Sequence, residues 1–195
     1  MTKSELRKKY LQQREAFSRE EVLSLSQKIF RNFIENFKLE EGQKIHCFLS
    51  IPEKGEVHTE MFLNEFFRKN IRVFVPKIFK NKLISIEINS ETTLLKSSWG
   101  ISEPERNEDS GENIFDFVIT PLLYCDGKGN RVGYGKGYYD GFFEKIKPDS
   151  IKVGVSFFNP AEEIDDVWNN DIPLDYLVTP TTLLSFFGTA SKSTK

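Results

Sequence analysis

Short runs rich in β-branched and aromatic residues alternate with helix-forming segments along most of this chain. The strand-like runs cover residues 44–51, 71–78, 83–88, 114–125, 151–158 and 175–179. One helix is predicted after Thr59, and another at residues 137–146 after a glycine-rich loop. Strands separated by helices favour a mainly parallel, open sheet that is covered on both faces. The sequence therefore predicts an α/β fold with three layers, α/β/α.

Two helices are predicted before the first strand. Each begins with a capping box, in which a hydroxyl residue is followed three positions later by a glutamate: Thr2 with Glu5, and Ser18 with Glu21. Gly42 is the expected end of the second helix. No internal repeat or linker rich in Pro, Gly or Ser divides the chain, so residues 1–187 are predicted to form a single domain. Residues 102–113 are interpreted as a solvated loop and residues 188–195 as a flexible tail.

Composition indicates which partners the protein can bind and in which cell compartment it is expected. With 38% apolar residues, 29% charged residues and a net charge of −2, the chain lacks the basic excess that nucleic-acid binding requires. No apolar run is long enough to span a bilayer. The cysteines, Cys47 and Cys125, lie in apolar runs and are interpreted as buried thiols of a reducing compartment. We therefore expect a cytoplasmic protein that binds small molecules rather than nucleic acid or membranes.

The segment DGKGNRVGYGKGYYDGFF, residues 126–143, carries the strongest local signal. It follows a predicted buried strand, and its glycines are Gly127, Gly129, Gly133, Gly135, Gly137 and Gly141. Glycines at this position let the backbone approach a phosphate group and direct N–H groups toward it. Arg131 and Lys136 would add positive charge, and Asp140 could bind a metal ion that bridges phosphate oxygens. The spacing matches neither the P-loop nor the GxGxxG fingerprint, so an ordinary glycine-rich turn remains an alternative.

Three cations share one face of the first predicted helix. At 3.6 residues per turn, Lys3, Arg7 and Arg14 fall nearly on one line, and apolar residues flank that line on both sides. Charges on a face that docks against the protein need a partner, which favours an anion-binding role. The alternative is that these long side chains extend to the rim of the apolar face and are solvated there.

The chain resembles the 5-formyltetrahydrofolate cyclo-ligase family between residue 3 and about residue 180. The resemblance is carried by RVGYGKGYYD, together with KSELRKKY, GEVHTEMF, WGISEP and DIPLDYLVTP in the same order along the chain. It implies an open α/β sheet related to the sugar-phosphate isomerase and CoA-transferase folds. It also implies an ATP-dependent ligase that requires Mg²⁺ and acts on a reduced folate in one-carbon metabolism.

Roles for individual residues follow from the same resemblance. The residues implied in ATP binding are Lys3, Arg7, Arg131, Gly133, Tyr134, Gly135, Lys136, Gly137, Tyr138, Tyr139 and Asp140. The residues implied in folate binding are Glu56, Trp99 and Tyr138. Asp140 and Asp175 are the implied Mg²⁺ ligands, although turn statistics alone would make Asp175 an ordinary turn or cap residue. Arg14 has the helical phase of a further phosphate contact. Position 141 is Gly where many members of the family have Arg.

The implied reaction is the cyclisation of 5-formyltetrahydrofolate to 5,10-methenyltetrahydrofolate, with release of ADP and phosphate. No protein nucleophile is expected in it. Two other functions are open to this sequence: an ATP-dependent kinase of a small metabolite, and a folate-binding protein without catalytic activity. The assembly is expected to be a monomer or a homodimer.

Overall fold

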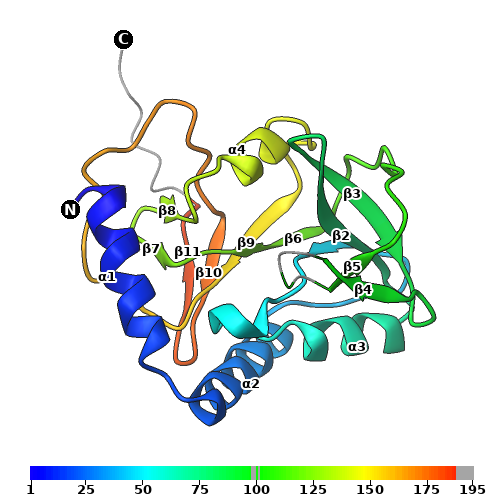
Figure 1. The fold of residues 1–195 in the computed structure, drawn as a ribbon, viewed down its shortest axis with the longest axis horizontal. Helices are drawn as coiled ribbons and strands as arrows, with labels where there is room; N and C mark the ends of the chain where they lie inside the picture. The colour runs from blue at the N-terminus through cyan, green and yellow to red at the C-terminus, as the bar shows by residue number, and fades with distance from the viewer. Residues whose placement is uncertain (98–99, 101, 188–195) are drawn as a thin grey trace.

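A seven-stranded sheet forms the centre of the computed structural model, which describes residues 1–97, 100 and 102–187. The strand order is β11-β10-β9-β6-β1-β2-β3 (Figure 1). These strands are β1 (Lys44–Cys47), β2 (Arg72–Phe79), β3 (Lys82–Ile88), β6 (Phe117–Pro121), β9 (Ile151–Val155), β10 (Tyr176–Val178) and β11 (Leu183–Ser185). The inner strands pair in parallel, whereas β3 and β11 pair antiparallel at the two edges. The predicted mainly parallel sheet is confirmed.

Helices and short strands complete the fold. The helices are α1 (Lys3–Glu15), α2 (Arg19–Asn36), the 3₁₀ turn η1 (Pro52–Lys54), α3 (Glu60–Arg68) and α4 (Tyr138–Phe143). Two small antiparallel pairs join β4 (Leu94–Lys96) to β5 (Ser102–Pro104) and β7 (Tyr124–Cys125) to β8 (Arg131–Val132). Both predicted capping boxes are present, at Thr2 and Ser18. The prediction for Gly42 is wrong: α2 ends at Asn36, and Gly42, with φ +82°, lies in the turn before β1.

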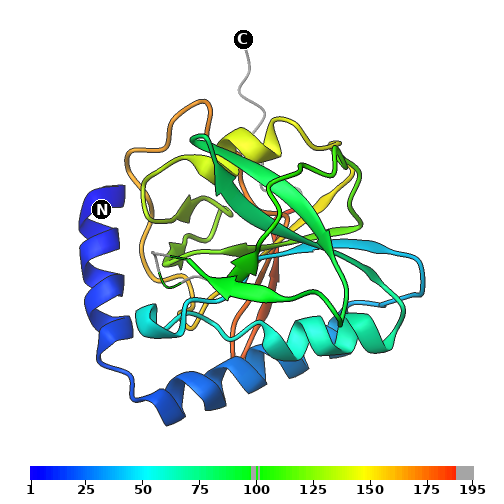
Figure 2. The ribbon, with the colours of Figure 1, turned by 45° about the vertical axis from the view of Figure 1, so that its right-hand side comes forward.

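Apolar side chains divide between the two faces of the sheet because successive residues of a strand point in opposite directions. Val73 and Val75 of β2 pack toward α2 and α3, in a core that includes Phe33 and Phe62. Phe74 of β2 packs on the other face with the residues of α4. Figure 2 shows α2 and α3 side by side below the sheet, with α4 above it. The helix α1 packs separately, against β7 and β8.

The strand order places a crevice beside β1. From β1 the chain adds β2 and β3 on one side, and it then returns to place β6 on the other side of β1. Where the order reverses in this way, the connections after neighbouring strands diverge and leave a crevice at the carboxyl ends of the strands. Phe48 directly follows β1 and Pro121 ends β6, so both lie at that edge of the sheet.

Residues 105–111 are exposed, as predicted for a solvated loop, but the segment 102–113 is also tied to the rest of the protein. Its first residues form β5, and the backbone N–H of Ser110 donates to the carbonyl of Ser85 at 2.8 Å. The buried ammonium of Lys77 donates to the carbonyls of Pro104 at 2.5 Å and Glu105 at 3.2 Å. A buried ammonium needs such acceptors, and the segment therefore covers one end of β2.

Gly154 of β9 lies where an added side chain would collide with its neighbours. A Cβ at this position would lie 2.5 Å from Cδ1 of Leu174 and 3.0 Å from Cδ2 of Leu122. We expect Gly154→Ala to lower the free energy of unfolding by about 1–3 kcal/mol, because an added methyl group must displace packed side chains. Urea denaturation measures the change. Gly127→Ala is the matched control, since a Cβ there meets nothing within 4 Å; equal stability of the two variants would contradict the prediction.

Candidate active site

A cleft of about 1280 Å³ opens at the crevice beside β1. Its walls come from α1, the segments after β1, the end of β2, the glycine-rich segment and the loop 166–171. The predicted site residues that line it are Lys3, Arg7, Glu56, Arg131, Gly133, Tyr134, Gly135, Lys136, Gly137, Tyr138, Tyr139 and Asp140. Residues far apart in the sequence thus meet at one place in the fold.

The glycines of the segment 126–143 serve different purposes. Gly129 has φ +86°, and a Cβ there would lie 2.9 Å from the carbonyl oxygen of Leu174, so this glycine is needed for a turn and close packing. Gly135 has φ +81°, and its Cβ would lie 3.2 Å from the guanidinium of Arg7. A Cβ at Gly133 meets nothing within 4 Å. The alternative of an ordinary turn therefore accounts for Gly129, whereas Gly135 allows a cation to approach the loop.

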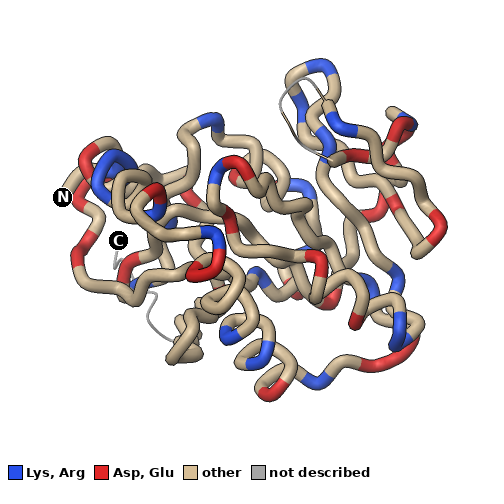
Figure 3. Tube along the Cα trace, turned by 60° about the horizontal axis from the view of Figure 1, so that its bottom comes forward, with Lys and Arg blue, Asp and Glu red and all other residues tan. Residues whose placement is uncertain are grey.

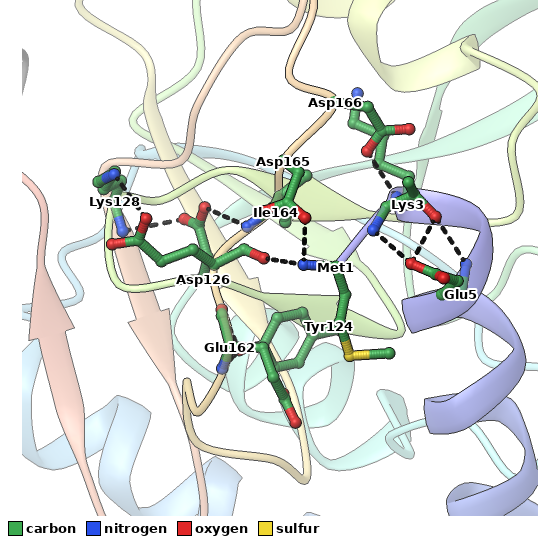
Figure 4. Close-up of polar contacts among 12 residues, drawn as sticks. Met1, Lys3, Glu5, Tyr124, Asp126, Lys128, Glu162, Ile164, Asp165 and Asp166 are labelled. Carbon is green, nitrogen blue, oxygen red and sulfur yellow. Dashed lines mark hydrogen bonds and ion pairs between the residues drawn. The ribbon is translucent and has the colours of Figure 1, made fainter.

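The cations of α1 reach the cleft because the start of the helix is anchored to the loop 162–166 (Figure 4). The amino group of Met1 forms an ion pair with Asp165 at 2.7 Å, and the backbone N–H of Lys3 donates to Asp166 at 2.6 Å. Nε of Arg7 donates to the carbonyl of Gly133 at 2.8 Å, and Nζ of Lys3 forms an ion pair with Asp171. Lys3 and Arg7 are therefore bound to partners in the protein and are not simply solvated at the rim of an apolar face.

Arg131 and Asp140 form an ion pair on the wall of the cleft. The distance from Nη2 of Arg131 to Oδ1 of Asp140 is 2.6 Å, and the side chain of Arg131 is only 8% exposed. The guanidinium also lies 4.6 Å from the centre of the Phe143 ring. Burial lowers the pKa of Arg131, and the charge of Asp140 and its hydrogen bond oppose that shift. A buried cation with a carboxylate partner is thereby held beside the glycine-rich loop.

Glu56 is the most buried carboxylate of the cleft, at 5% exposure. It accepts hydrogen bonds from the backbone N–H of Ile51 at 2.8 Å and from the hydroxyl of Tyr134 at 2.6 Å. Burial raises the pKa of Tyr134, and the charge of Glu56 adds to this effect. Tyr134 therefore stays protonated and acts as the donor to Glu56.

The model of the 5-formyltetrahydrofolate cyclo-ligase family matches residues 1–180 of this chain. The chain belongs to this family. Similar members include 5-formyltetrahydrofolate cyclo-ligase of Mus musculus, 30% identical over 86% of this chain and 93% of the mouse protein. The cyclo-ligase of Mycoplasma pneumoniae is 31% identical over 91% of this chain and 98% of that protein.

Solved structures of the cyclo-ligase family share the fold. The NMR structure of Aquifex aeolicus 5,10-methenyltetrahydrofolate synthetase superimposes with a TM-score of 0.76, at 32% identity, and covers 95% of this chain and 93% of that one.

In the described part of the present chain, no helix is long and apolar enough to cross a membrane. Figure 3 shows Lys and Arg interspersed with Asp and Glu along the trace.

The pair of metal ligands implied by the resemblance is not brought together in the cleft. Asp140 lines the cleft, whereas Asp175 is not among the described residues that do. Oδ2 of Asp175 accepts from the backbone N–H of Lys152 at 2.7 Å and from its ammonium at 2.9 Å. Trp99 lies outside the described residues. Both assignments remain predictions, and the structure gives Asp175 a partner on β9.

Asp140 is the predicted Mg²⁺ ligand that lines the cleft in the described structure. Among the described residues, no group of three or more His, Cys, Asp or Glu side chains is arranged to hold a metal ion. Mg²⁺ bound with a nucleotide takes most of its ligands from phosphate oxygens and water, so one or two carboxylates suffice. Asp140 meets that requirement, because its carboxylate faces the cleft beside Arg131.

Several cleft residues were not predicted from the sequence. Asp171 pairs with the ammonium of Lys3, and Lys54 lies 4.8 Å from the centre of the Tyr134 ring. Trp168 lines the cleft although its side chain is 73% exposed. A possible signal was the pattern VWNND at 167–171, where an aromatic residue is followed by polar ones just before the DIPLD motif.

Gly135 gives a test of the loop itself. We expect Gly135→Ala to raise the KM for ATP about tenfold, because a side chain at positive φ is strained by 1–2 kcal/mol and its Cβ crowds the Arg7 guanidinium. Steady-state kinetics with ATP varied measure the effect. Gly141→Ala is the control, since nothing lies within 4 Å of its Cβ. Unchanged ATP kinetics in Gly135→Ala would argue against contact between this loop and the nucleotide.

Proposed function

We propose that this chain catalyses the ATP-dependent cyclisation of 5-formyltetrahydrofolate to 5,10-methenyltetrahydrofolate, with release of ADP and phosphate. The observation that supports it most is the convergence of α1, the glycine-rich segment and Glu56 on one cleft in a member of the cyclo-ligase family. A small-metabolite kinase would also bind a second, polar substrate in such a cleft, so membership of the cyclo-ligase family is what favours cyclisation over phosphorylation of a metabolite.

The chemistry requires activation of an inert group. A formyl amide is a poor electrophile, and its oxygen is a poor leaving group. In the proposed reaction, the formyl oxygen attacks the γ-phosphorus of ATP, the bond to the β,γ-bridging oxygen breaks, and ADP leaves. N10 of the folate then attacks the carbon of the imidate phosphate. Phosphate departs with the former formyl oxygen, and N10 loses its proton, which leaves the methenyl ring.

The protein contributes positioning and charge to this reaction. We assign Lys3, Arg7 and Arg131 to the phosphates of ATP, with backbone N–H groups of residues 133–139 beside them. Lys3 and Arg131 are paired with Asp171 and Asp140, so both cations are held at the cleft before the nucleotide binds. Mg²⁺, when bound at Asp140 with the nucleotide, would neutralise charge on the phosphate oxygens. No side chain needs to form a covalent intermediate.

The folate is assigned to Glu56 and Tyr138, which both line the cleft. A buried carboxylate accepts hydrogen bonds from the N–H groups of a pterin ring, and an aromatic side chain suits the flat face of that ring. Trp99 is proposed to add a second aromatic surface. Cys47 and Cys125 are free and buried, which supports the proposal of a cytoplasmic enzyme.

The test is to mix the purified protein with 5-formyltetrahydrofolate, ATP and Mg²⁺ and to follow the near-ultraviolet absorbance of the methenyl product. We expect the absorbance to rise only when ATP is present, with one phosphate released per methenyl group formed. A kinase would leave phosphate on the substrate, and a binding protein would give no turnover. Either result would reject the proposal, as would product formation without ATP.

A further inference from the structure

A chain of hydrogen bonds joins three segments that are distant in the sequence. Nη2 of Arg14, on α1, donates to the hydroxyl of Tyr134 at 2.6 Å. That hydroxyl in turn lies 2.6 Å from Oε1 of Glu56. Arg14 and Glu56 are only 4% and 5% exposed. The helical phase of Arg14 suggested a phosphate contact. In the structure its guanidinium is instead bound to Tyr134, and Arg14 is not among the described residues that line the large cleft.

The direction of each hydrogen bond in this chain is determined by chemistry. A guanidinium can only donate, so Tyr134 must accept from Arg14, and its single O–H is left for Glu56. The other oxygen of Glu56 accepts from the backbone N–H of Ile51 at 2.8 Å. Each carboxylate oxygen therefore has one donor from the protein and keeps further acceptor capacity. The carboxylate of Glu56 is thereby held in one orientation as an acceptor.

The chain of hydrogen bonds also links the glycine-rich loop to Glu56. Tyr134 lies between Gly133 and Gly135. The carbonyl of Gly133 accepts a hydrogen bond from Arg7, and a Cβ at Gly135 would crowd the Arg7 guanidinium. Arg7 and Arg14 belong to the same helix, so α1 holds the glycine-rich loop at two points. The ammonium of Lys54 lies 4.8 Å from the centre of the Tyr134 ring, so a second cation accompanies Arg14 beside this tyrosine. The loop assigned to ATP and the carboxylate assigned to folate therefore share one side chain.

We propose that Arg14 and Tyr134 are positioning residues for the folate, which act by holding the carboxylate of Glu56 oriented toward the N–H donors of the pterin ring. This inference rests on the proposed function, because it takes the folate as the ligand of Glu56. It extends that function by assigning to the first helix, through Arg14, a role in folate affinity in addition to its role at the phosphates. If the network only stabilised the fold, its loss would change the KM for folate and the KM for ATP to the same extent.

The test compares Tyr134→Phe and Arg14→Met with the wild type, with folate and ATP varied separately. Tyr134→Phe keeps the ring and removes only the hydroxyl. We expect each variant to raise the KM for 5-formyltetrahydrofolate about tenfold, the effect of one lost hydrogen bond to a charged group, and to change the KM for ATP less than twofold. The double variant should have the same KM for 5-formyltetrahydrofolate as Tyr134→Phe alone, because both substitutions break the same chain of hydrogen bonds.

Two controls separate this inference from other effects. Gln13→Ala changes an exposed residue of α1 and should leave both KM values unchanged. Arg14→Lys retains a donor and a charge and should restore part of the folate affinity. Calorimetric titration of each variant with 5-formyltetrahydrofolate, without ATP, measures binding even if the wild type shows no turnover, so that failure of the proposed function can be recognised separately. Equal changes for folate and ATP, or additive losses in the double variant, would overturn the inference.

Discussion

Replacing Asp140 with Asn is expected to lower kcat on the order of 100-fold, with little loss of folded protein. The substitution removes a negative charge that faces the cleft beside Arg131. The loss has the size seen when one preorganised electrostatic group is removed from an active site. The amide oxygen of Asn can still accept from Arg131, so the buried guanidinium keeps a partner. The methenyl absorbance assay and thermal unfolding of the same sample measure the two effects.

Asp149→Asn is the matched control for this charge change. Asp149 is exposed and is not among the described residues that line the cleft, so its variant should have wild-type kcat. Wild-type turnover in Asp140→Asn would refute the role of this carboxylate. A large loss of folded protein would show instead that Asp140 acts through Arg131 on stability.

Replacing Arg7 with Met is expected to lower kcat/KM for ATP by a factor of about 10–100. The variant loses a cation beside the phosphates and the hydrogen bond from Nε to the carbonyl of Gly133, which orders the loop. Charge-assisted hydrogen bonds contribute about 1.5–3 kcal/mol each, which corresponds to this range. Met retains most of the apolar stem, so the packing of α1 should change little. Kinetics with ATP varied at saturating folate measure the effect.

Lys8→Met provides the comparison on the same helix. Lys8 is exposed and is not among the described residues that line the cleft. Loss of ATP affinity in both variants would indicate a general effect of charge on α1, whereas loss in Arg7→Met alone supports a specific contact with the nucleotide.

Features set by local sequence were predicted from the sequence most reliably. The capping boxes at Thr2 and Ser18 are present because all their atoms come from residues three positions apart. The cations of α1 could be recognised because charge on an apolar helical face is conspicuous at a period of 3.6 residues. The end of α2 was misjudged at Gly42, since a glycine with positive φ serves equally well in the turn before a strand.

Features that depend on contacts distant in the sequence could not be predicted. The pairing of Asp171 with Lys3 and the burial of Lys77 under the carbonyls of residues 104–106 arise only when the sheet is assembled. The short strands β4, β5, β7 and β8 are too brief to show a period of two. The role of Arg14 was ambiguous for the same reason: helical phase placed it on the inner face, but its partner Tyr134 is 120 positions away.

The central claim, that ATP activates the formyl oxygen, is tested most directly by isotope transfer. The protein is supplied with 5-formyltetrahydrofolate labelled with ¹⁸O in the formyl group, together with unlabelled ATP, and the released phosphate is analysed by mass spectrometry. If the formyl oxygen attacks the γ-phosphorus, each phosphate released with a methenyl group carries one ¹⁸O atom. Unlabelled phosphate, with methenyl product formed at the same rate, would contradict the account.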